Sequence, residues 1–78
     1  MPNPFPSLNE RAMLAVLRRK LGYEIVRQRG SHRHLEAEGR PPLTFAFHPG
    51  QGLSPGIVRD ILVKQVGLTQ DKALEVVR

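Results

Sequence analysis

Hydrophobic residues near the N-terminus recur with the period of a helix that buries one face. Ser7 and Glu10 have the S-x-x-E spacing of a capping box, in which each side chain satisfies a free backbone N–H at the start of a helix. Gly22 is a typical helix stop. These signals predict a helix over about 8–21. Its apolar stripe comprises Leu14, Leu17 and Leu21, widened by Ala12, Met13 and Val16.

The pattern then changes from helical spacing to the composition and alternation of strands. Residues 23–29 are rich in β-branched and aromatic side chains and end at Gly30, which predicts a first strand. A second strand is expected over 31–37, closed by a turn at 38–40. Residues 43–48 alternate between large apolar and smaller or polar side chains, which predicts a third strand. Because the links are short, we expect the three strands to form an antiparallel meander.

A second helix follows a glycine-rich loop. Ser54 is placed to cap it, and Pro55 occupies the first helical position, where a missing N–H costs nothing. Gly67 is expected to end this helix, and Thr69 to cap a last short helix. The predicted apolar stripe of the second helix comprises Ile57, Ile61, Leu62 and Val66.

The predicted order, a helix, three antiparallel strands, a second helix and a helical tail, indicates a two-layer α+β fold. Both helices are expected on one face of the sheet, which leaves the other face open. A chain of 78 residues has room for one domain, so we assign 1–78 to a single unit, with an irregular proline-rich segment over 1–7. The chain has no cysteine, which excludes disulfides and thiolate metal sites.

The charge balance indicates a polyanionic partner. Twelve Lys and Arg against seven Asp and Glu give a formal net charge of +5 and a pI near 10.8. Nucleic acid is the first candidate for a basic domain of this size, although a basic surface can also serve solubility alone. The N-terminus lacks the basic and apolar regions of a signal peptide, and no apolar run approaches the roughly 20 residues that span a membrane. We expect a cytoplasmic protein without a membrane partner.

The basic residues are concentrated in the stretch RQRGSHRH, residues 27–34, which combines three arginines with two histidines. Side chains alternate across a strand, so if Leu35 and Ala37 point inward, His32, His34 and Glu36 share the open face. By the same argument, the apolar residues of the third strand face the helices and His48 points to the open side. The sequence therefore predicts a basic sheet face that also carries histidines.

Four interpretations compete for this face. The side chains can be ordinary solvated surface. Three histidines can also hold zinc, but no acidic ligand has an obvious spacing and the arginines would repel a cation. Arginines can hold RNA by its phosphates without any reaction. Finally, a histidine, which titrates near neutral pH, can take a proton from a ribose 2′-hydroxyl and so start RNA cleavage without a metal. The spacing of the residues alone does not decide between RNA binding without a reaction and RNA cleavage.

The residues also resemble those of a known family. The run LGYEIVRQRGSH, residues 21–32, is similar to the signature of HicA toxins, also called YcfA-like proteins, with its Gly-aromatic start and Gly-Ser-His end. Residues 53–62 resemble the second helix of that family, and the similarity covers about 8–70. The resemblance implies a fold like that of double-stranded-RNA-binding domains. It also implies an mRNA interferase, a ribosome-independent endoribonuclease, which a HicB-like antitoxin neutralises. With the metal-free reaction considered above, we expect an enzyme that needs neither a metal ion nor a cofactor.

The family's catalytic histidine corresponds to His32, and Gly30 and Ser31 match the neighbouring motif positions. We therefore expect His32 to act as the general base. A non-catalytic RNA-binding module is the alternative, because it would need the basic face but not His32. The residues expected to contact RNA are Arg27, Arg29, Gly30, Ser31, Arg33 and His48.

Overall fold

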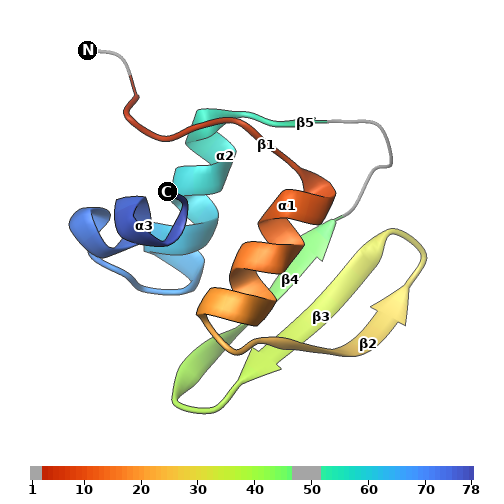
Figure 1. The fold of residues 1–78 in the computed structure, drawn as a ribbon. Coiled ribbons are helices and arrows are strands. Elements are labelled where there is room, and N and C mark those ends of the chain that lie inside the picture. The colour runs from red at the N-terminus through yellow and green to blue at the C-terminus, as the bar shows by residue number, and fades with distance from the viewer. Residues whose placement is uncertain (1–2, 47–51) are drawn as a thin grey trace.

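A computed structural model describes residues 3–46 and 52–78 (Figure 1). Two short π-helices, η1 and η2, directly continue the α-helices α1 and α2. The elements in chain order are β1 Leu8–Asn9, α1 Glu10–Ala15, η1 Val16–Lys20, β2 Glu24–Arg29, β3 His32–Ala37, β4 Arg40–Ala46, β5 Gly52–Leu53, α2 Pro55–Arg59, η2 Asp60–Gln65 and α3 Gln70–Val76.

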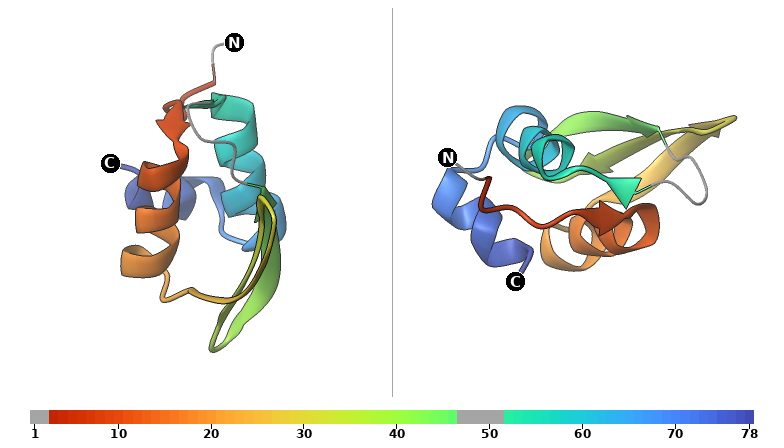
Figure 2. Two further views of the ribbon diagram at one scale, coloured as in Figure 1. Left: turned by 90° about the vertical axis from the view of Figure 1, so that its right-hand side faces the viewer. Right: turned by 90° about the horizontal axis from the view of Figure 1, so that it is seen from above.

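Strands β2, β3 and β4 form an antiparallel meander, which leaves β2 and β4 as the edges of the sheet. Figure 2 shows the helices on one side of this sheet and its other face uncovered. The hairpin of β2 and β3 extends beyond the helices. The predicted two-layer α+β architecture is thus confirmed. None of the described helices is long and apolar enough to cross a membrane.

The core lies between the helices and the covered face of the sheet. Leu35, Leu43 and Phe45 point into it from the sheet, as the alternation predicted. The caps predicted for the later helices are also confirmed. The Ser54 hydroxyl accepts a hydrogen bond from Ile57 N at 3.3 Å, and the Thr69 hydroxyl accepts one from Lys72 N at 3.2 Å. Other buried core residues are Phe5, Met13, Leu17, Leu21, Tyr23, Val58, Ile61, Leu62, Val66 and Ala73.

The capping box predicted at the first helix is wrong. The helix begins at Glu10, and the cap is Asn9, whose side-chain oxygen accepts a hydrogen bond from Ala12 N at 2.7 Å. Leu8 and Asn9 are in β1, which pairs with β5 in a two-stranded ribbon that the sequence did not predict. This long-range pairing keeps the chain extended up to residue 9, so Ser7 stands too early to be the cap.

Both predicted apolar stripes need one correction. In the first helix Met13, and not Leu14, is buried with Leu17 and Leu21. Positions four apart stay on one face here because the hydrogen bonds of the π-helical part span five residues. In the second helix Val58 is buried and Ile57 is 48% exposed. The inward positions of that helix therefore begin one residue later than predicted.

Tyr23 ties the end of the first helix to the far edge of the sheet. Its ring is buried, and its hydroxyl donates a hydrogen bond to the carbonyl oxygen of Pro41 at 2.7 Å. Arg40 Nε donates to the carbonyl oxygen of Leu21 at 3.1 Å. Gly22, with a φ of 77°, makes the reversal between helix and strand in the left-handed region that glycine tolerates.

We expect the only tyrosine of the chain to titrate above its usual range. Burial raises the pKa of the Tyr23 phenol above 10.0, and the charge of Arg40 offsets part of this rise. The unfolded chain therefore ionises first, so the stabilisation by neutral Tyr23 is complete below about pH 10 and is lost at higher pH. Phenolate absorbance should give a higher midpoint for the native protein than for the protein in urea. Equal midpoints would contradict the burial of the Tyr23 side chain.

Candidate functional site

The faces of the β2–β3 hairpin are set by a bulge at Val26. Ile25 lies opposite Leu35, but Arg27 lies opposite His34, so Val26 is an extra residue in β2. Residues directly opposite each other in an antiparallel pair share a face. Ile25 is therefore on the helix side with Leu35, whereas Arg27 is on the open side with His34. Without the bulge, regular alternation would put Arg27 on the same side as Ile25.

A shallow cleft of about 270 Å³ lies on the open face of the sheet. Arg29 stands opposite His32 and Arg27 opposite His34, so the two arginines and two histidines form two adjacent cross-strand pairs. Thr44, on β4, lies opposite His34 and completes the lining. The arrangement combines two guanidinium groups with two imidazoles on an accessible surface. It is suited to hold a phosphate and to accept a proton beside it.

The two histidines of this cleft differ in their contacts. His34 Nδ1 lies 3.2 Å from the Thr44 hydroxyl oxygen, and His34 Nε2 lies 3.4 Å from a carboxylate oxygen of Glu36. Both ring nitrogens of His34 are therefore engaged. The exposed His32 ring makes no hydrogen bond or ion pair within residues 3–46 and 52–78. His32 is the histidine whose ring nitrogens remain available to a bound molecule.

Arg33 does not join the other two arginines. It stands between His32 and His34, so its side chain leaves the strand on the opposite, helix-facing side, across from Gln28 and Phe45. Its Nε donates a hydrogen bond to the Gln28 side-chain oxygen at 3.3 Å. The expectation of one cluster of three arginines is therefore wrong, because neighbouring residues in a strand point to opposite faces.

Gly30 and Ser31 form the turn between the two strands, so β3 begins at His32, one residue later than expected. Gly30 has a φ of 59°, in the left-handed region where other residues are strained. The side chain of Gln28, at the end of β2, contacts this turn: its Nε2 donates a hydrogen bond to the Gly30 carbonyl oxygen at 3.4 Å. The turn places His32 directly at the end of the hairpin, beside Arg29.

His48 was predicted at this site, whereas Thr44 was not. His48 lies outside the described residues. The structure adds Thr44, to which the sequence analysis gave no role. Thr44 could have been found from its position, since it alternates with the buried Leu43 and Phe45 and must therefore face the same side as the histidines. Within the described part of the chain, no three His, Asp or Glu side chains are grouped so as to hold a metal ion.

Comparison with known proteins gives one family. The sequence matches the HicA toxin of bacterial toxin–antitoxin systems over residues 11–68 of its 78 residues. The matched region includes both strands of the hairpin, the whole cleft and the second helix. No match is found among curated proteins or among solved structures.

Proposed function

Because this chain belongs to the HicA toxin family, we propose that it is an endoribonuclease, an mRNA interferase that cuts RNA with His32 as its general base. The observation that carries this proposal is the placement of Arg27, Arg29 and the unengaged His32 on one uncovered sheet face. Arginine side chains bind phosphate oxygens through charge-assisted hydrogen bonds. Because no helix covers this face of the sheet, a polynucleotide of any length can lie across it.

The proposed reaction uses the substrate's own 2′-hydroxyl as the nucleophile. A ring nitrogen of His32 accepts the proton of that hydroxyl, and the 2′-oxygen attacks the adjacent phosphorus. The bond from phosphorus to the 5′-oxygen breaks, and the departing oxygen takes a proton from water. One fragment ends in a 2′,3′-cyclic phosphate and the other in a 5′-hydroxyl. Arg29, directly across from His32, stabilises the negative charge on the phosphoryl oxygens.

The same face is proposed to be covered when the toxin is neutralised. Toxins of this family act with an antitoxin partner, and a HicB-like antitoxin that occupies the cleft would exclude RNA from Arg27, Arg29 and His32. Since mRNA is the proposed substrate, the cytoplasm is the proposed place of action. The formal charge of +5 favours an acidic antitoxin.

Incubation of the purified protein with a long RNA in EDTA tests the activity directly. We expect discrete fragments even in EDTA, because the reaction needs no metal ion. The fragments should carry 2′,3′-cyclic phosphate ends, because the 2′-hydroxyl is the nucleophile. An oligonucleotide with a single 2′-deoxyribose at the cut site should remain whole at that position, since it lacks the nucleophile. Cleavage of the deoxy substrate, or fragments with 5′-phosphate ends, would contradict the mechanism. Binding without any cleavage would favour the RNA-binding module instead.

The two arginines of the cleft should account for part of the salt dependence of RNA binding. Neutralised phosphates release counterions, so log K falls with log salt concentration by about 0.7 for each contact with a single strand. We expect Arg27→Ala with Arg29→Ala to flatten this slope by about 1.4. Arg33→Ala removes one such charge from the other face and should leave the slope nearly unchanged. A slope flattened by about 0.7 in Arg33→Ala, the change expected for each arginine of the cleft, would show that the open face does not select the phosphates.

A further inference from the structure

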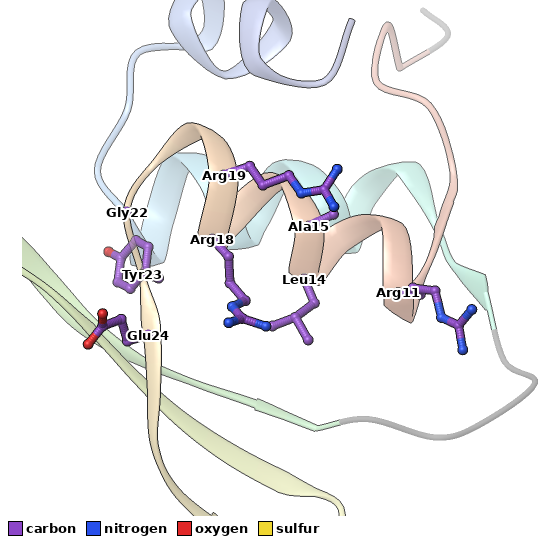
Figure 3. Close-up of a pocket in the computed structure, with 8 residues that line it drawn as sticks. All are labelled: Arg11, Leu14, Ala15, Arg18, Arg19, Gly22, Tyr23 and Glu24. Atoms are coloured by element: carbon purple, nitrogen blue, oxygen red, sulfur yellow. The ribbon is translucent and has the colours of Figure 1, made fainter.

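A second concave surface lies on the helix side of the molecule, away from the cleft of the open sheet face. It has a volume of about 580 Å³ and is formed by one face of the first helix together with the start of β2 (Figure 3). Positions 11, 14, 15, 18 and 19 line it with the three- and four-residue spacing of a single helix face, and Gly22, Tyr23 and Glu24 line its strand end. We call this surface the α1–β2 groove. It shares no lining residue with the cleft that holds His32.

The groove is strongly basic, and its cations lack partners within the described part of the chain. Arg11, Arg18 and Arg19 line it, are exposed, and make no side-chain hydrogen bond or ion pair there. Glu24 is the one acidic residue of the lining and lies at its strand end. The three arginines are spread over two helical turns, so they can meet several carboxylates along an extended surface.

The groove also has apolar character that an RNA backbone would not use. Leu14 and Ala15 lie between the arginines on the helix and are only half buried. In Figure 3 the side chains of Leu14 and Arg18 both project to the side where β2 runs. Ile25 and Val26, which directly follow Glu24 in this edge strand, are 36% and 51% exposed. Apolar side chains exposed beside a charged rim are typical of a surface that binds protein.

We propose that the α1–β2 groove docks an acidic segment of the antitoxin that also carries apolar side chains. Its carboxylates pair with Arg11, Arg18 and Arg19, and its apolar residues cover Leu14 and the exposed part of β2. The inference rests on the toxin–antitoxin partnership of the family, but not on the His32 mechanism. The antitoxin then has a contact that does not compete with RNA for the cleft. Charge complementarity and the apolar centre together favour protein over RNA as the occupant.

Nuclear magnetic resonance of the isolated chain tests the chemistry of the groove. The probes are a short synthetic peptide that alternates glutamate with leucine, a second peptide that alternates glutamate with serine, and a short single-stranded RNA. We expect the glutamate–leucine peptide to shift the amide signals of residues 11–19 and 22–26, and to bind at least about tenfold more tightly than the serine peptide. RNA should shift the signals of residues 27–34. Equal binding of both peptides, or RNA in the groove, would overturn the proposal.

Charge reversal then tests the groove in the complex with the antitoxin itself. Arg11→Glu with Arg18→Glu should weaken the complex by about tenfold or more. Lys64→Glu with Lys72→Glu, outside the groove, lowers the net charge from +5 to +1 in the same way and should have little effect. Equal weakening by both pairs, or by neither, would overturn the proposal. RNA cleavage by the groove variant is measured in parallel and should persist. If neither the wild type nor any variant cleaves RNA, the result contradicts the proposed function but not the docking surface.

Discussion

His32→Ala is expected to lower the rate of RNA cleavage by about 10²–10⁴-fold, the usual contribution of a positioned general base. The ring of His32 is exposed and makes no hydrogen bond or ion pair among the described residues. Its removal should therefore change the free energy of unfolding by no more than about 0.5 kcal/mol. RNA affinity should be nearly retained, because Arg27 and Arg29 remain. Single-turnover cleavage and chemical denaturation of the same preparations measure the two effects separately.

His34→Ala is the matched control, since it removes an imidazole from the same cleft two residues away. Its ring is engaged with Thr44 and Glu36, so we expect a smaller loss of rate and a measurable loss of stability. If His34→Ala abolishes cleavage and His32→Ala does not, the assignment of the base is wrong. If His32→Ala unfolds the protein, His32 is structural.

Leu35→Ala should destabilise the fold by about 2–5 kcal/mol, as for other fully buried leucines. Leu35 has no exposed surface and lies at the centre of β3, between Ile25 on one neighbouring strand and Leu43 on the other. Small domains have a total stability at the low end of about 5–15 kcal/mol, so this loss is a large fraction of the whole. We expect a marked fall in the urea midpoint and partial unfolding at ambient temperature.

Ile25→Ala provides the comparison for this variant, because Ile25 lies directly opposite Leu35 but is 36% exposed. Its truncation should cost about 1 kcal/mol or less. Similar losses for the two variants would mean that the helix-facing side of β2 is covered to the same extent as β3. That result would contradict both the exposure of Ile25 beside the α1–β2 groove and its position outside the buried core.

Much of the fold follows from local signals in the sequence. The alternation around Phe45 and the isolated Leu35 correctly predict which face of the sheet is buried. Ser54 and Thr69 cap the helices that they were predicted to cap, because each is followed at once by a helical pattern with no competing strand. For the site, alternation alone places His32 and His34 on the same open face.

The remaining features depend on contacts between distant parts of the chain. Asn9 replaces Ser7 as the cap because β1 pairs with β5, some 40 residues later in the sequence. Phe5 is buried although it lies in a proline-rich segment whose described residues, 3–7, form neither helix nor strand. The face on which Arg27 lies depends on the bulge at Val26, and a valine at that position does not predict a bulge. The sequence therefore predicts the faces of β3 but not those of β2.

The bulge at Val26 has a consequence for how the hairpin tolerates changes in length. Val26 is exposed and is an extra residue in the pairing of β2. If Val26 is deleted, Arg27 follows Ile25 directly, and regular alternation still places Arg27 on the open side. Among homologous sequences and in deletion libraries, this position should therefore accept many amino acids and also a gap. A deletion of Gln28, by contrast, would make Arg27 and Arg29 neighbours and put them on opposite faces, so the basic face depends on the residue count between Arg27 and the turn.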